Sequence, residues 1–188
     1  MSVVSVPERM RISVDRYRKM VETGVLTEYD RIELIDGDMI NMAPIGPNHA
    51  AVTAQLNRLF VLSAGDSAIV SPGGPIKLGE YSEPQPDLML LKPRADFYAT
   101  RIPTPPDVLL VVEVSDSSLA FDQSTKRALY ARHGIAEYWV VDIPRQRIHV
   151  YCQPTVDGYG EALERARTDA VSPRALPAIQ VTVGTLFA

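Results

Sequence analysis

Two uninterrupted apolar runs constrain the fold of this chain more than any other feature. They are Leu88–Leu91 and Val108–Val112. A short run without polar residues predicts a strand that is buried on both faces, because a strand with one solvated face alternates apolar and polar residues. We therefore expect both runs to be central strands of a sheet that is covered on both sides.

A carboxylate borders each run. Asp87 opens the first strand after Pro86, and Glu113 closes the second. If the strands pair antiparallel, the start of one lies beside the end of the other, and both carboxylates share one edge of the sheet. For either residue alone, the alternative is that Glu113 caps a backbone amide and that Asp87 merely starts its strand.

Two carboxylates at a buried edge repel each other and need a countercharge, which a metal, a lysine or an arginine can supply. A hard cation such as Mg²⁺ is the natural candidate, because it is bound by one or two carboxylates together with water and phosphate oxygens. The pair therefore predicts an acidic metal-binding site.

The remaining pattern predicts helices that cover a mixed sheet, an α/β (α+β mixed) fold. Asp36-Gly37 between two apolar-rich runs is a strong signal for a hairpin with a type I′ turn. The other expected elements are a short helix from the N-cap Ser13 to Gly24, a helix His49–Ala64, short strands at 68–70 and 76–78, a helix Phe121–His133, a strand pair at 138–141 and 147–151, and a loop-like tail from Gln153 until 179–187.

The chain has 188 residues without a visible repeat or linker, which predicts one domain over 1–188 with the first helix and the hairpin as a lead-in to about 44. No apolar run approaches the roughly 18 residues of a membrane-spanning helix, so we expect no membrane segment. The single cysteine, Cys152, cannot form an internal disulfide and fits a reducing cytoplasm. It also excludes a cluster of thiolate metal ligands.

The net charge of −4, from 19 basic and 23 acidic residues, argues against a protein that coats nucleic acid. A local basic face is compatible with a negative net charge, because for binding nucleic acid the clustering of charges on one surface matters more than the net charge. Such a face is indicated by Lys126, Arg127, Arg132, Arg145 and Arg147.

Lys126 is expected to point toward the sheet. On a helical wheel at about 100° per residue it falls between Leu129 and Tyr130, the large residues that should face the core. The alternative is an exposed Asp122–Lys126 pair, which would stabilise the helix by a few tenths of a kcal/mol.

Several short motifs together resemble the Uma-type (Uma-two) family of the PD-(D/E)xK nuclease superfamily. They are Asp-Gly after Ile-Glu-Leu-Ile, the Pro-x-x-His helix start, Pro86-Asp87, Glu113-Val-Ser115, Asp122-x-x-x-Lys126 and Glu137-Tyr-Trp-Val-Val-Asp142. Each motif alone is weak, but their order and spacing are specific over nearly the whole chain. The resemblance implies a restriction endonuclease-like core and Mg²⁺-dependent cleavage of DNA.

The chain departs from the superfamily pattern at one position. The pattern expects a lysine two residues after the second acid, where this sequence has Ser115. The resemblance suggests that the lysine has moved to the following helix as Lys126. A long flexible side chain tolerates such relocation better than a carboxylate ligand does.

The resemblance also implies roles for the candidate residues. Asp87 and Glu113, with the backbone carbonyl of Val114, would hold Mg²⁺ (or Mn²⁺), and Lys126 would orient the attacking water or stabilise charge on the phosphate. Three accessory candidates remain open. Glu33 is either an additional acid or a cross-strand partner; His49 contacts phosphate or is a structural donor; Asp122 accompanies Lys126.

Two other functions stay open at this stage. One is a catalytically weak or inactive nuclease-fold module for DNA binding or assembly, and the other is a hydrolase of small phosphorylated substrates. A homodimer is also considered, because duplex cleavage needs two active sites. The strand at 147–151 or the terminal segment would then be an edge that pairs between protomers.

Overall fold

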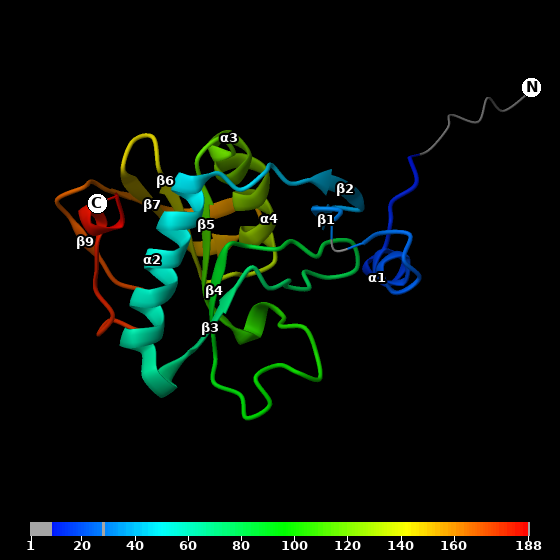
Figure 1. Cartoon of the computed structure of the whole chain (residues 1–188), viewed down its shortest axis with the longest axis horizontal. Helices are drawn as coiled ribbons and strands as arrows, with labels where there is room; N and C mark the ends of the chain where they lie inside the picture. The colour runs from blue at the N-terminus through cyan, green and yellow to red at the C-terminus, as the bar shows by residue number, and fades with distance from the viewer. Residues whose placement is uncertain (1–8, 28, 188) are drawn as a thin grey trace, which may run out of the picture.

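A six-stranded mixed sheet forms the centre of the protein (Figure 1). The computed structural model describes residues 9–27 and 29–187. The strands follow one another across the sheet in chain order, and the predicted mixed α/β class is confirmed. They are β3 (Ile69–Pro72), β4 (Leu88–Leu91), β5 (Val108–Ser115), β6 (Glu137–Asp142), β7 (Arg147–Thr155) and β8 (Gly158–Arg165).

The two apolar runs are interior strands, as predicted. β4 and β5 pair antiparallel with Leu88 opposite Val112, so the residue before β4 lies beside the carboxyl end of β5. β5 and β6 are the one parallel pair in the described sheet. A parallel pair requires a crossover connection. That crossover passes over one face of the sheet near the end where Asp87 and Glu113 lie.

Helices cover both faces of the sheet (Figure 1). α2 (Pro47–Ala64) packs through Val52, Leu56 and Phe60 against the face that carries Leu88 and Val112. The β5–β6 crossover covers the opposite face, to which Val111 and Glu113 point because side chains alternate along a strand. Within the described ranges, no helix is both long enough and apolar enough to cross a bilayer.

The crossover is not the single helix 121–133 that the sequence predicts. It begins two residues earlier and contains a π-helical segment, which is rare and is frequently found at functional sites. Gly134 ends it with φ 76°, as expected. Its parts are α3 (Leu119–Phe121), the π segment η3 (Asp122–Lys126) and α4 (Arg127–Arg132).

The N-terminal helix and hairpin form as predicted. α1 (Val14–Glu22) is capped by Ser13, whose hydroxyl accepts a hydrogen bond from the Arg16 N–H (3.3 Å). Strands β1 (Ile32–Ile35) and β2 (Asp38–Asn41) pair antiparallel around Asp36 and Gly37, whose φ angles of 53° and 84° fit a type I′ turn. Reciprocal backbone hydrogen bonds between Leu34 and Glu83 join this hairpin to the segment before β4.

Two expected strand boundaries are wrong. Residues 76–78 form no strand, although Ile76 and Leu78 are buried. Their N–H groups donate hydrogen bonds to the carbonyls of Pro84 and Ser82 in the same loop. These two residues are therefore buried without being part of a β-sheet. β5 continues to Ser115, which places Glu113 inside the strand rather than at its end.

The expected loop-like tail is also wrong. β7 extends to Thr155, and β8 pairs along it, so the 147–151 strand is interior and the sheet ends at β3 and β8. The polar composition of β8 indicates a loop, but an edge strand is partly exposed to solvent and often carries charged side chains. The remaining short elements are η1 (Gly65–Ser67), η2 (Pro105–Asp107), β9 (Ala170–Val171), β10 (Val181–Thr182) and η4 (Val183–Phe187).

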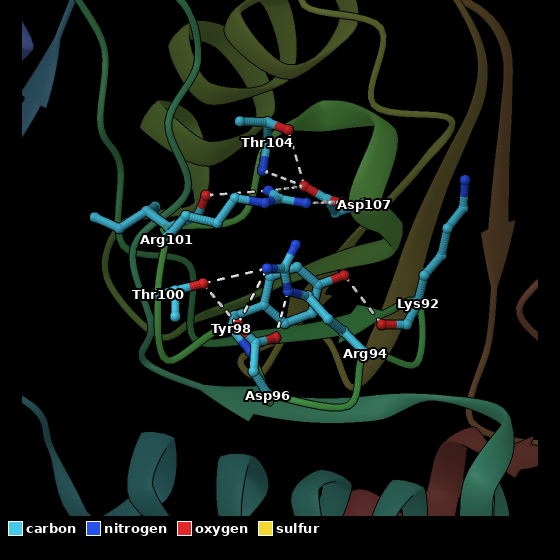
Figure 2. A network of polar contacts seen from close by, with 9 residues as sticks. Lys92, Arg94, Asp96, Tyr98, Thr100, Arg101, Thr104 and Asp107 are labelled. Atoms are coloured by element: carbon cyan, nitrogen blue, oxygen red, sulfur yellow. Dashed lines mark hydrogen bonds and ion pairs between the residues drawn. The ribbon is translucent and has the colours of Figure 1, made fainter.

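The long loop between β4 and β5 is held by its own polar network (Figure 2). Asp96 receives hydrogen bonds from the Arg94 guanidinium, from the Thr100 hydroxyl (2.7 Å) and from the Tyr98 N–H (3.3 Å). The Arg94 guanidinium holds the pKa of Asp96 well below its usual range. Tyr98 and its neighbour Phe97 have positive φ angles of 63° and 49°, a conformation that non-glycine residues rarely adopt. The network around Asp96 therefore offsets local backbone strain.

We predict that Asp96→Asn loosens this loop without unfolding the protein. The amide cannot hold the Arg94 guanidinium as a carboxylate does, so residues 94–100 should exchange backbone amide hydrogens faster. Hydrogen exchange read by mass spectrometry measures this, with Asp157→Asn in the exposed β7–β8 turn as control. Unchanged exchange at 94–100 would show that the network does not hold the loop.

Candidate functional site

Asp87, which directly precedes β4, and Glu113, which lies within β5, are side by side at one end of the sheet, as the sequence predicts. The β4–β5 register sets this position, and the Val114 N–H donates a hydrogen bond to Asp87 Oδ2 (2.7 Å). The two acids line the same cavity. Glu113 is only 3% exposed, whereas the Asp87 side chain keeps 23% of its surface accessible.

Lys126 points inward and lies between two acids. Its Nζ is 3.0 Å from Glu113 Oε1 and 3.2 Å from Glu33 Oε1. The inward orientation is thus confirmed, and the alternative of an exposed Asp122–Lys126 surface pair is wrong, because both side chains are buried. The lysine supplies the countercharge that the buried acids require.

The start of the π segment is fixed through Asp122. Asp122 Oδ2 accepts hydrogen bonds from the hydroxyls of Ser115 (2.7 Å) and Ser118 (2.5 Å), and the Asp122 carbonyl accepts one from the Tyr138 hydroxyl (3.1 Å). Lys126 is the last residue of this segment. Asp122 therefore anchors the turn from which Lys126 reaches the sheet, rather than pairing with the lysine at the surface.

Tyr130 is a member of the site that the sequence reading missed. Its buried hydroxyl donates to Glu113 Oε1 (2.8 Å), the same oxygen that Lys126 contacts. The sequence reading treated Tyr130 only as a core residue. Its spacing of four residues from Lys126 was the available signal, since residues i and i+4 share a helix face.

The hairpin brings Glu33 into the cluster. Glu33 is buried, and its Oε2 accepts a hydrogen bond from the Gln85 N–H (3.2 Å) while its Oε1 faces Lys126. The pairing of Leu34 with Glu83 fixes the adjacent backbone. Glu33 therefore pairs with a basic residue, but that residue is Lys126 of the crossover and not one across the hairpin, and the pair belongs to the interior cluster.

His49 contacts Asp87 from the start of α2. Its Nε2 lies 3.1 Å from Asp87 Oδ1, and the hydrogen bond to Asp87 raises the pKa of His49. His49 Nδ1 is buried and has no hydrogen-bond partner among the described residues. Asp87 is thus held on both carboxylate oxygens, by His49 and by the Val114 N–H.

Burial and charge act in opposite directions in this cluster. Burial raises the pKa of Glu113 well above its ordinary value, and the charge of Lys126 opposes that shift. Burial alone would lower the pKa of Lys126, but the charges of Glu113, Glu33 and Asp122 outweigh it and raise the pKa. The lysine therefore stays a cation, and a further cation beside Glu113 would favour the ionised carboxylate.

The site opens into a cavity of about 380 Å³. Its lining includes all the candidate side chains of the sequence analysis, together with Arg31 and Asp116, which that analysis did not name. Arg31 Nη1 donates to the Ala43 carbonyl (2.8 Å) in the segment between β2 and α2. The cavity therefore combines an acidic floor with one arginine at its wall.

The expected basic face is wrong. Lys126 is buried, Arg132 pairs with Asp36, Arg145 with the buried Asp142, and Arg147 with Glu164. Arg127 packs over the ring of Tyr151, 5.4 Å from its centroid. Closeness in sequence did not produce a free positive surface, because acids pair with four of the five cations, Lys126, Arg132, Arg145 and Arg147.

The oxygen donors present suit a hard cation. Asp87 and Glu113 line the cavity together with Val114, and carboxylate and carbonyl oxygens are the ligands that Mg²⁺ and Mn²⁺ prefer. Across residues 9–27 and 29–187, no three His, Cys, Asp or Glu side chains converge as a metal site. Mg²⁺ usually binds one or two carboxylates and completes its shell with water and substrate oxygens, so the donor set fits it.

The geometry can now be set beside known proteins. A family model described as "Putative restriction endonuclease", Uma2, matches residues 14–184. The chain belongs to the Uma2 family. A crystal structure described as "a putative nuclease belonging to DUF820" from Anabaena variabilis has 19% identity and a TM-score of 0.75, with 94% of this chain and 97% of that chain covered. A search of curated proteins found no match.

The match supports the resemblance to the Uma-type family seen in the sequence motifs. At 19% identity, the similarity to the solved structure establishes the shared fold alone. This Uma2 protein and the solved structure therefore share their overall fold. The roles of individual residues follow from the geometry of the site and from experiment.

We predict that Lys126→Met destabilises the protein by about 3–5 kcal/mol, because it leaves Glu33 and Glu113 buried without a countercharge. Denaturant unfolding followed by circular dichroism measures the change. Lys92→Met, which replaces an exposed lysine, should stay within about 0.5 kcal/mol of the wild type. A neutral or stabilising Lys126→Met would show that the acids do not depend on this lysine.

Proposed function

We propose that this Uma2 protein is a metal-dependent endonuclease that hydrolyses DNA phosphodiester bonds with Mg²⁺ or Mn²⁺. The observation that carries the proposal is the buried group formed by Glu113, Lys126 and Glu33 beside the more accessible Asp87. An interior charge cluster of this kind is costly to maintain, and clusters with perturbed pKa values concentrate at functional sites.

Three groups would hold the metal ion: the carboxylates of Asp87 and Glu113 and the carbonyl of Val114. The Ser115 carbonyl accepts a hydrogen bond from Ile143 on the β6 side (3.0 Å). Neighbouring residues of a strand direct their backbone groups to opposite sides, so Val114 directs its carbonyl toward β4. Its N–H already meets Asp87 on that side, which supports a shared site.

When bound, the metal ion lowers the pKa of a water molecule and polarises the scissile phosphate. Lys126 would orient the attacking water or stabilise charge on the phosphate, while Tyr130 and Glu33 keep the lysine and Glu113 in place. His49 would hold Asp87 in its orientation. The water oxygen forms a new bond to phosphorus, the bond from phosphorus to one deoxyribose oxygen breaks, and that oxygen takes up the proton that the water releases.

We predict that Asp87→Asn and Glu113→Gln each lower Mn²⁺-dependent nicking of supercoiled plasmid DNA by more than about 100-fold, because each removes a charged metal ligand. Gel electrophoresis of the nicked form measures the rate. Asp66→Asn changes an exposed acid in η1 away from the cavity and should keep the wild-type rate. Nicking that persists in both site variants would refute the assignment of these residues.

We predict that Tyr130→Phe weakens Mn²⁺ binding by about 10–100-fold, the usual effect of removing a hydrogen-bond partner of a metal ligand. Isothermal titration calorimetry measures the affinity. Tyr159→Phe is the matched control, because its hydroxyl donates to the Ile135 carbonyl (2.9 Å) and touches neither acid. Equal affinity in the two variants would mean that Tyr130 has only a packing role.

A second candidate is a nuclease-fold module that binds DNA without cleaving it. Glu113 Oε1 is already occupied by Lys126 and Tyr130, which favours this candidate. Mn²⁺ titration of the wild-type protein separates the two. Saturable Mn²⁺ binding that Asp87→Asn abolishes supports the endonuclease. The absence of Mn²⁺ binding supports the module that binds DNA without cleaving it.

A further inference from the structure

The innermost groups of the site can be reached only from within the cavity. Glu113 and Lys126 are 3% and 5% exposed, and they line a cavity of about 380 Å³. That volume is at the low end of the roughly 300–1,000 Å³ of pockets that enclose a small organic molecule. A phosphate group therefore reaches Glu113 by entering a cavity whose volume suits a small group such as one nucleotide.

One wall of the cavity is the segment between β2 and α2, residues 42–46, named here the strap. The Met42 N–H donates to the Arg31 carbonyl (2.8 Å), and the Arg31 guanidinium donates to the Ala43 carbonyl (2.8 Å). These two bonds tie the strap to the residue that precedes β1. The strap is thus a fixed border of the cavity rather than an unattached loop.

A second hollow lies against the same strap. It has a volume of about 480 Å³, and it shares five lining residues with the first cavity: Arg31, Met42, Ile45, Gln85 and Asp87. The two hollows therefore adjoin at the strap, and Asp87 borders both. A linear chain that occupied both hollows would pass Asp87 beneath or beside the strap.

The walls combine two kinds of chemistry. Ile40, Met42, Ile45 and Phe121 offer apolar surface, and Arg31 offers a guanidinium near the acids of the floor. Apolar and aromatic side chains bind unstacked bases, and cationic groups follow the phosphates, in proteins that bind single strands. In a paired duplex the bases are stacked on their neighbours and cannot contact such walls.

Resting on the proposed nuclease function, we propose that the substrate is an unpaired nucleic acid strand, which lies along the two hollows so that a single nucleotide enters the cavity above Glu113. A fully paired duplex would have to extrude that nucleotide first, at a cost of a few kcal/mol, and the cost is least where the strand is already unpaired.

The test compares three labelled DNA oligonucleotides that share one sequence: a single strand, its paired duplex, and a duplex with a central unpaired loop. With Mn²⁺, the single strand should be cut at least about tenfold faster than the duplex, and the looped duplex should be cut within its loop. A duplex that is cut as fast as the single strand, or faster, would overturn the proposal.

Binding in Ca²⁺, measured by fluorescence anisotropy, separates this proposal from the proposed chemistry. If no DNA is cut but the single strand binds at least about tenfold tighter than the duplex, the substrate class stands and the nuclease assignment fails. If cleavage occurs but binding and cutting do not distinguish the two forms, the nuclease assignment stands and the unpaired substrate is refuted.

A matched pair of variants locates the strand on the protein. Ile45→Ala removes a side chain that is 56% exposed and lines both hollows, so it should weaken single-strand binding several-fold without unfolding the protein. Leu62→Ala removes an aliphatic side chain of α2 that is 74% exposed and lines neither hollow, and it should bind like the wild type. Equal affinities of the two variants for the single strand would show that the strap does not contact the bound nucleic acid.

Discussion

The ammonium group of Lys126 is the interaction on which the rest of the site depends. It neutralises Glu33 and Glu113, two acids that come from separate parts of the chain and that would repel each other without it. The lysine therefore ties the N-terminal hairpin to the central strand β5 through the crossover. Because both acids are almost fully buried, the three charges must be brought together during folding. The Gln85 N–H satisfies the other carboxylate oxygen of Glu33, and the Tyr130 hydroxyl donates to the same Glu113 oxygen that the lysine contacts.

The apolar runs, the hairpin and the inward lysine could be predicted from the sequence because each depends on local periodicity. Leu88–Leu91 and Val108–Val112 read as buried strands, and Asp36-Gly37 as a turn, without knowledge of their neighbours. The π segment and β8 could not be predicted in this way. Asp122 is anchored by Ser115 and Ser118, and the charges of β8 are matched by residues such as Arg147 and Arg174. Such partners are set by tertiary structure, which overrides local propensity.

The same distinction applies within the site. Asp87 and Glu113 could be placed together from the sequence on the condition that the two runs pair antiparallel, which the structure confirms. Tyr130 and the Asp87–His49 contact depend on how the helices pack on the sheet, and neither spacing alone nor composition decides that packing. The predicted basic face failed partly for the related reason that Asp36 and Glu164, which pair with Arg132 and Arg147, come from the hairpin and from β8. The Arg145–Asp142 pair is local, with the partners three positions apart in sequence.

Ser115 explains how a nuclease-like site can lack a lysine at its usual position. Its hydroxyl does not substitute for the ammonium group; it holds Asp122, the first residue of the π segment that ends at Lys126. Ser115 and Lys126 are thus linked through Asp122. The serine on strand β5 holds the first residue of the π segment, and the lysine at the end of that segment supplies the positive charge. Restoring a lysine at position 115 would remove the hydroxyl that anchors Asp122 and would place a second ammonium group beside the first. Lys126 therefore depends on Ser115 through Asp122, and a change at position 115 would disturb the segment that carries the lysine.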